Sequence, residues 1–444
     1  MLITIVHVLM ILMFLLGLLG LAVLTLVKPL RKWLKASSVW VGLVPLVLAL
    51  MGLGLISAAY VTASDFIVTP INIEELFWIA LFCSGTLLLN LGWLTLWQSH
   101  RVLGRSLGLV GMGISLVGLG LAVLQGGQVP RAIEQAEAEM QAAFGPNYAK
   151  KIPTELANTQ RTSAFSLVDY FKGVALDSDK VKLTTDIVYR TVDNQKLTLD
   201  IYEPTLGKAG ALRPTLVVVH GGGWQIGDKS ELPALNYYLA ARGWTVFSLN
   251  YRLLPQYPFP YATEDVQCAL AYINQNSKNY GVDTGRMTIL GRSAGATMAL
   301  TTAYMPSPIG SAATCGVMPA LRGVVSYYGE TNMATWYDHG GGNSLTIPYL
   351  GGTPSQQPEN YRLASPLTYV NRTLPPTLLI HGDKDSIVNI EQSLILIPRL
   401  KENGNQVALI RIAWPGHGFD TWRNGFSNQI ALYYTERFLN LVTN

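Results

Sequence analysis

A serine between two glycines is the first pattern in the chain that could do chemistry. Residues 291–295 read G-R-S-A-G, after an apolar run at 287–290 and before a helical pattern. Between a strand and a helix, this spacing makes a sharp turn that exposes the serine hydroxyl at the carboxyl edge of a sheet. The glycines remove side chains that would clash where strand and helix approach. We therefore predict Ser293 as a nucleophile rather than part of an inert turn.

A glycine run follows an earlier apolar segment. Residues 220–224 read H-G-G-G-W directly after the run 215–219. The tetrahedral intermediate of acyl transfer carries a negative oxygen, which needs N–H donors that are already in place. Consecutive glycines let the backbone approach a substrate and point its amides into the site. The predicted oxyanion hole consists of the N–H groups of Gly222 and Gly223 with that of Ala294, just after the nucleophile.

A serine nucleophile needs a general base, and the chain has six histidines. His417 follows the last predicted strand, in a loop that could carry an imidazole over the serine. We predict it as general base and acid. The other five lie in the apolar N-terminal part, before a glycine at a strand end, or in an irregular insertion: His7, His100, His220, His381 and His339.

An acid must orient the imidazole and stabilise its charged form. The apolar run 377–380 ends in H-G-D-K-D, which offers Asp383 and Asp385. The chain order Ser, Asp, His is the one expected for a nucleophile on this kind of turn. Ser293, Asp385 and His417 meet that order.

These residues need a frame of strands and helices to position them. Buried runs that alternate with helical patterns favour a mainly parallel sheet covered on both faces. Strands are predicted at 187–191, 197–202, 215–219, 245–249, 287–290, 323–327, 377–380 and 408–412. Helices are predicted at 231–242, 263–278, 294–304, 390–402 and 427–442. The first two strands lack a helix between them and should form an antiparallel edge hairpin.

The N-terminal part has a different composition. Charged residues make up only 14% of the chain, against about 25% in typical soluble proteins, and most of the deficit precedes residue 125. Four apolar stretches, at 2–27, 39–61, 76–97 and 103–124, are long enough to cross a bilayer. Basic residues gather in the first and third short loops, which predicts both chain ends outside. The sequence thus predicts a multi-pass integral membrane protein with an extracytoplasmic catalytic domain, N-out and C-out.

The predicted organisation has three parts. Residues 1–125 form a transmembrane four-helix domain, residues 126–182 a helical linker, and residues 183–444 the catalytic domain. An insertion at 329–363 is expected to form part of a cap over the site. Cys268 and Cys315 could pair or stay free, and the sequence does not decide. Basic residues form no long runs, so nucleic-acid binding is not expected.

Several motifs together resemble the α/β-hydrolase superfamily, and within it the esterase and lipase group related to hormone-sensitive lipase and to bacterial feruloyl and acetyl esterases. The motifs lie at residues 220–224 and 227–229, 250–253, 257–260, 264–266, 291–295 and 381–385. The resemblance spans about residues 183–442. It implies an α/β-hydrolase fold with a mostly parallel eight-stranded sheet and helices on both faces. It also implies the acid at Asp385 and oxyanion donors at Gly222, Gly223 and Ala294.

The chain departs from this family at two positions, Asn250 for a frequent Asp and Ala296 for a common Gly. The expected function is that of a serine carboxylic-ester hydrolase, which acts through an acyl-enzyme on a small-molecule or lipid ester. No metal or cofactor is expected to be needed. Membrane lipid is expected as a further partner. One alternative is a serine peptidase or amidase of the same fold, prolyl-oligopeptidase-like or arylformamidase-like. Another is a catalytically silent binding module on a membrane anchor.

Overall fold

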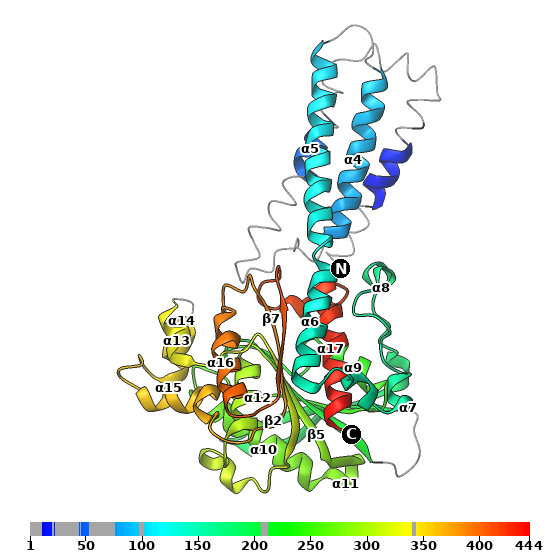
Figure 1. Ribbon diagram of the computed structural model, residues 1–444. Helices are drawn as coiled ribbons and strands as arrows, with labels where there is room; N and C mark the ends of the chain where they lie inside the picture. Colours follow the sequence, from blue (N-terminus) through cyan, green and yellow to red (C-terminus); the bar gives the residue numbers. More distant parts are fainter. Residues whose placement is uncertain are drawn as a thin grey trace. The chain divides into compact units, whose positions relative to one another are not determined.

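The computed structural model describes residues 11–19, 22, 44, 46–52, 76–96, 102–205, 212–339 and 343–444 (Figure 1). The chain divides into two compact units, Met1–Arg131 and Ala132–Asn444. Each unit is described by itself below.

Two long helices dominate the described part of the first unit, α4 (Leu76–Leu96) and α5 (Val102–Gly126). Polar side chains join them. The hydroxyls of Thr86 on α4 and Ser115 on α5 lie 2.9 Å apart, and within α4 the Asn90 side chain donates to the Thr86 carbonyl at 2.8 Å. A Cβ on Gly111 would overlap the Asn90 side chain, so the glycine permits this close approach.

The prediction of a multi-pass membrane protein is wrong. Among the described residues, no helix is long and apolar enough to cross a membrane. Thr86 on α4 and Ser115 on α5 place polar groups between the two long helices. Most of the predicted spans 2–27 and 39–61, His7, His100 and nearly all the charges used to orient the chain lie outside the described residues. The extracytoplasmic, N-out and C-out placement is withdrawn with the spans.

The second unit begins with segments that pack on its last helix, α17 (Phe426–Val442). Helix α6 (Val129–Phe144) contributes Phe144, whose ring lies 5.8 Å from that of Phe438. The Gln429 side chain accepts from the backbone of Ser166 at 2.9 Å, beside α8 (Leu167–Lys172). The short elements between them are η3 (Tyr148–Lys151), α7 (Thr154–Ala157) and, after α8, η4 (Ser178–Lys180).

An eight-stranded sheet forms the centre of this unit, in the order β1-β2-β4-β3-β5-β6-β7-β8. The strands are β1 (Val181–Val192), β2 (Gln195–Pro204), β3 (Arg213–Val219), β4 (Thr245–Leu249), β5 (Val282–Arg292), β6 (Leu321–Tyr327), β7 (Thr377–Gly382) and β8 (Val407–Ile412). β1 pairs antiparallel with β2, and β2 with β4, whereas all later pairs are parallel. The predicted sheet, mostly parallel with an antiparallel edge hairpin, is confirmed.

Helices cover both faces of the sheet, with α9 and α17 on one side and α10, α12 and α16 on the other (Figure 1). Their bounds are α9 (Ala234–Ala240), α10 (Tyr261–Gln275), α12 (Ala294–Tyr304) and α16 (Glu391–Glu402). Residues of β3, β4, β5 and α12 are almost wholly buried, so the core surrounds the turn that carries Ser293. Short elements complete the unit: α11 (Ser277–Tyr280), η5 (Gly310–Thr314), η6 (Pro366–Tyr369) and η7 (Phe419–Thr421).

The insertion after β6 folds into α13 (Met333–Asp338), α14 (Asn343–Leu350) and α15 (Pro358–Ala364). It packs on the indole of Trp224, which ends the glycine run. The Tyr349 ring stacks on that indole at 3.9 Å, and the Trp336 ring lies 6.2 Å from it. The insertion therefore covers the loop predicted to hold an oxyanion.

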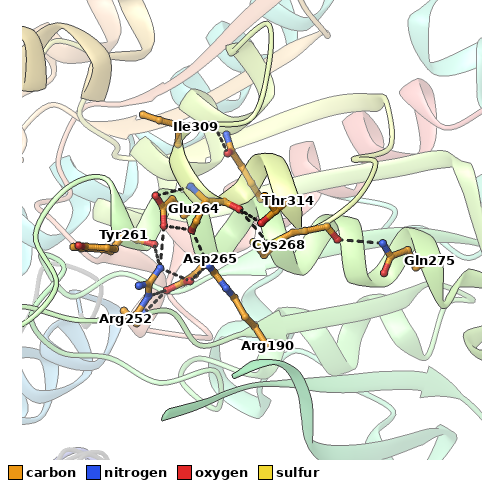
Figure 2. Close-up of a disulfide and its surroundings, with 12 residues drawn as sticks. Arg190, Arg252, Tyr261, Glu264, Asp265, Cys268, Gln275, Ile309 and Thr314 are labelled. Atoms are coloured by element: carbon orange, nitrogen blue, oxygen red, sulfur yellow. Dashed lines mark hydrogen bonds and ion pairs between the residues drawn. A yellow bond between two sulfur atoms is a disulfide. The ribbon is translucent and has the colours of Figure 1, made fainter. Parts of the chain in front are cut away.

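A disulfide joins Cys268 on α10 to Cys315, which follows η5. Figure 2 shows it beside a cluster of buried charges, with Arg190 and Arg252 directed at Asp265. The Asp265 carboxylate lies 2.7 Å from Arg190 and 2.7 Å from Arg252, and Glu264 lies 3.2 Å from Arg252. Disulfide and charges together fix α10 to the loop that passes through η5.

Candidate active site

Ser293 occupies a sharp turn between β5 and α12. Its backbone has φ 52° and ψ −126°, a conformation that side-chain-bearing residues adopt only where the surrounding structure enforces it. Two close approaches enforce it here, because a Cβ on Gly291 would overlap the Gly295 carbonyl and a Cβ on Gly295 would overlap that of Val219. The Ser293 amide also donates to the Tyr327 carbonyl at 2.9 Å. The turn is thus held from both neighbouring strands.

The structure brings three of the predicted residues into one hydrogen-bonded row. His417 Nε2 lies 2.9 Å from Ser293 Oγ, and His417 Nδ1 lies 2.7 Å from Asp385 Oδ2. With the proton on Nδ1, the imidazole donates to the carboxylate and accepts the serine hydroxyl at Nε2. The His417 side chain is 8% exposed and that of Asp385 is fully buried, so bulk water competes little with either contact.

The Asp385 carboxylate is braced from several directions. Its Oδ1 accepts from the backbone N–H groups of Ile387 at 3.0 Å and Val388 at 2.8 Å. His381 Nε2 lies 3.5 Å from Oδ2. Burial opposes the charged form, but His417 and His381 outweigh it and hold the pKa of Asp385 well below its usual range. Asp383, the other acid considered, instead lies 2.5 Å from Arg411 and does not reach His417.

Negative charges surround the His417 imidazole. Burial alone would lower its pKa, but Asp385, then Glu330 and Asp420, outweigh burial and raise the pKa of His417 above 6.5. Glu330 is itself buried, accepts the Thr297 hydroxyl, and has a pKa that burial raises above its usual value. Sequence reasoning missed Glu330, because it lies three residues past β6 in no recognisable motif.

The glycine run forms a loop that packs directly against the serine turn. Gly222 has φ +110°, and a Cβ there would overlap the Ile226 carbonyl. A Cβ on Gly221 would lie 3.0 Å from the Arg292 carbonyl. Within the described ranges, the N–H groups of Gly222, Gly223 and Ala294 donate to no acceptor. Donors left free at a helix start and in a glycine loop can receive a negatively charged oxygen.

His220 and Tyr251 brace this loop. The Tyr251 hydroxyl donates to the carbonyl of His220 at 3.0 Å and to that of Gly221 at 3.2 Å, and the two rings stack at 4.2 Å. Burial lowers the pKa of His220 to about 4, so this imidazole stays neutral. His339 lies elsewhere, partly exposed and 2.8 Å from Glu391.

Both departures from the family pattern have a local explanation. The Asn250 side chain accepts from the Lys229 amide at 2.6 Å and donates to Asp228 at 2.9 Å, which a carboxylate could not do. The Ala296 methyl has room because residue 329 is glycine; a Cβ there would lie 2.5 Å from that methyl. In the part of the chain that the structure describes, no group of three or more acidic, His or Cys side chains could hold a metal ion.

The second unit is similar in sequence to known esterases. The BD-FAE family model matches residues 199–400. Esterase LipC of Mycobacterium tuberculosis is 31% identical over 47% of this chain and 53% of LipC, and Esterase LipQ of the same organism is 27% identical over 68% of this chain and 73% of LipQ. The chain thus spans about half the length of LipC.

A solved structure supports the fold. Esterase B from Lactobacillus rhamnosis superimposes with a TM-score of 0.50 at 21% identity, covering 69% of this chain and 96% of that one. At this identity the likeness concerns the fold. The sheet topology and this likeness give the second unit the same fold as that esterase structure, and residues 199–400 are similar to the BD-FAE family.

Proposed function

We propose that the protein is a serine carboxylic-ester hydrolase with Ser293, His417 and Asp385 as its catalytic triad. The observation that carries the proposal is the continuous row from Asp385 Oδ2 through both imidazole nitrogens to Ser293 Oγ, at 2.7 and 2.9 Å. The names of the curated relatives, among them LipC, LipQ and the Pseudomonas putida ethyl acetate hydrolase, support ester chemistry.

The proposed reaction has two halves. In the first, His417 Nε2 takes the Ser293 proton while Oγ attacks the ester carbonyl, and the imidazolium then gives that proton to the leaving alcohol. In the second, His417 activates water, which releases the acid from the acyl-enzyme. The N–H groups of Gly222, Gly223 and Ala294 hold the negative oxygen in both halves, and Asp385 stabilises the imidazolium.

The oxyanion loop also indicates where the substrate would lie. A Cβ on Gly223 would lie 3.0 Å from a methyl group of Leu345 on α14. The insertion thus places an apolar side chain beside one of the proposed oxyanion donors. We propose that Leu345 borders the bound ester and that α14 limits the groups that fit there.

The test is hydrolysis of p-nitrophenyl acetate by the full-length chain and by Ser293→Ala. Loss of the nucleophile should reduce kcat by at least about 10⁴-fold. Ser230→Ala is the matched control, because Ser230 is an exposed serine that bonds to Asp228, and it should retain full activity. A peptide and a formamide substrate assayed in parallel separate esterase from peptidase and amidase. Full activity of Ser293→Ala would refute the proposal.

A further inference from the structure

Three buried side chains beside the proposed triad have no role in the reaction described above. Asp420 accepts from Arg292 Nε on one carboxylate oxygen and from the Tyr328 hydroxyl on the other. The Arg292 and Asp420 side chains are 7% and 2% exposed. A buried charge pair is tolerated where hydrogen bonds accompany the ionic contact, and here each Asp420 oxygen accepts one. We call Arg292, Tyr328 and Asp420 the Asp420 cluster.

Each member of the Asp420 cluster comes from a different part of the site. Arg292 ends β5 and precedes Ser293. Tyr328 follows β6, and its ring meets the His417 ring at an angle of 61° with centroids 4.6 Å apart. Asp420 lies in η7, which begins two residues after His417. The cluster therefore connects the serine turn, the end of β6 and the histidine loop.

The path of the histidine loop depends on what holds the residues after His417. The chain turns at Gly418, with φ +71°, directly after the histidine. Phe419 then packs on Tyr328 with ring centroids 5.3 Å apart, and Asp420 is fixed by its two hydrogen bonds. Because a shift of about 1 Å in a reacting group can cost about 10²-fold in rate, anchoring this turn bears on catalysis.

We propose that Asp420 is a positioning residue, which holds the His417 imidazole against Ser293 through the Tyr328 ring and through the turn at residues 418–421. This inference rests on the proposed esterase function. The Asp420 charge also acts on the imidazole directly, together with Asp385 after β7 and Glu330 after β6. Asp420 thus affects the position and the charge of the His417 imidazole. A pH profile can distinguish these effects from a role in folding alone.

Asp420→Asn keeps the size of the side chain and its acceptor for Tyr328 but removes the negative charge. We expect kcat for p-nitrophenyl acetate to fall about 10–100-fold with KM changed less than about twofold. Removing a negative charge lowers the pKa of His417, so the acidic limb of the pH profile should move to lower pH. Glu203→Gln, which removes a carboxylate 2.9 Å from Arg213 on the antiparallel side of the sheet, is the control and should leave that limb in place.

A second variant keeps the test valid if Asp420→Asn folds poorly with Arg292 left unpaired. Tyr328→Phe removes only the hydroxyl and leaves the ion pair and the ring against His417. It should lower kcat about 3–10-fold, and the double variant should lose less than the product of both losses, because the two residues act as one unit. Circular dichroism gives the folded fraction for each variant.

The outcomes are distinguishable. Wild-type kcat per folded molecule in both variants, with an unmoved acidic limb, would make the Asp420 cluster purely structural and overturn the inference. If Ser293→Ala instead keeps its activity, the proposed function itself fails, whatever Asp420→Asn does. A lower kcat and a moved limb in Asp420→Asn, with Ser293→Ala inactive, support both.

Discussion

The second unit contains two clusters of buried charged groups, and the two clusters differ in how their charges are paired. Around Arg252, acidic and basic groups are paired (Figure 2). Asp265 forms ion pairs with both Arg190 and Arg252. Glu264 forms an ion pair with Arg252 and accepts the Ser311 hydroxyl at 2.6 Å. Around His417, the carboxyl groups of Asp385, Glu330 and Asp420 lie near a single imidazole, and only Asp420 is paired with an arginine, Arg292. One nitrogen of that imidazole lies next to Ser293, which has a strained backbone. We call these the Arg252 cluster (Arg190, Arg252, Glu264 and Asp265) and the His417 cluster (His417, Asp385, Glu330 and Asp420); acidic and basic groups are paired in the first, whereas a titratable imidazole lies among several carboxyl groups in the second.

In this unit, the groups expected to stabilise the fold and the groups expected to carry the reaction lie in different places. Strain and uneven charge persist only where the surrounding structure over-determines them, and they concentrate at sites of reaction. The strand core and the Arg252 cluster supply that surrounding structure. Damage to the Arg252 cluster should therefore lower stability, and damage to the His417 cluster should lower the rate.

Asp385→Asn should reduce kcat by about 10³–10⁴-fold, because an amide favours the wrong imidazole tautomer and no longer stabilises the imidazolium. Asp383→Asn, two residues away and bonded to Arg411, is the control and should keep more than half of the activity. Steady-state ester hydrolysis measures both. Equal losses in the two variants would remove the distinction between the two acids.

Asp265→Asn should lower the free energy of unfolding by about 3–5 kcal/mol, because it leaves Arg190 without its carboxylate and Arg252 with Glu264 alone. The kcat per folded molecule should change less than about twofold. Urea unfolding followed by circular dichroism gives the stability, and activity normalised to the folded fraction gives the rate. A loss of rate as large as that of Asp385→Asn would show that the two clusters are not separate.

Loss of the disulfide, by Cys268→Ser with Cys315→Ser, should lower the free energy of unfolding by about 2–4 kcal/mol. The bond closes a loop across a separation of 47 residues, and opening that loop enlarges the unfolded ensemble. Ester hydrolysis should be unaffected at temperatures where the variant stays folded. Cys83→Ser, in the first unit, serves as control for thiol replacement, and inactivation of the folded double variant would contradict the prediction.

The acidic limb of kcat/KM should lie above pH 6.5, because the free enzyme needs neutral His417 and its pKa is raised. The same shift has the opposite effect on stability. A raised folded-state pKa adds stability that is complete below 6.5, the unfolded value, and is lost as the pH rises through the folded value. As the pH rises through the folded-state pKa of His417, activity should therefore increase while the contribution of His417 to folding stability is lost. Paired pH series of kcat/KM and of unfolding midpoint measure both, and a limb at or below pH 6.5 would contradict the shift.

Much of the frame could be predicted from the sequence. Strand β4 and helix α12 have the predicted limits, because neither contains a charged residue and both are buried over nearly their full length. β1 is longer than predicted, since its exposed half alternates irregularly and includes Asp186 at φ +59°. The prediction of a multi-pass membrane protein was wrong; it rested on hydropathy, which does not show polar groups that meet between two helices, such as Thr86 and Ser115.

The site divides in the same way. The sequence predicts the site residues that follow a strand in a recognisable local pattern, which are Ser293, Asp385, His417 and the glycine run. Their catalytic roles stay predictions. Glu330 and Asp420 could not be predicted from the sequence. Asp420 meets Tyr328 and Arg292 across 92 and 128 residues of sequence, and such contacts leave no local trace.

The parallel register of the sheet has a consequence for how such proteins diverge. Val219 pairs with Gly291, Tyr327 with Ile380, and Gly382 with Ile412, so the strands that carry the site end in step with one another. Loops beyond that edge can therefore differ in length while the strand ends keep their alignment. A foreign segment grafted in place of residues 333–364 should change substrate range, provided that it keeps the aromatic contacts that Trp336 and Tyr349 make with Trp224.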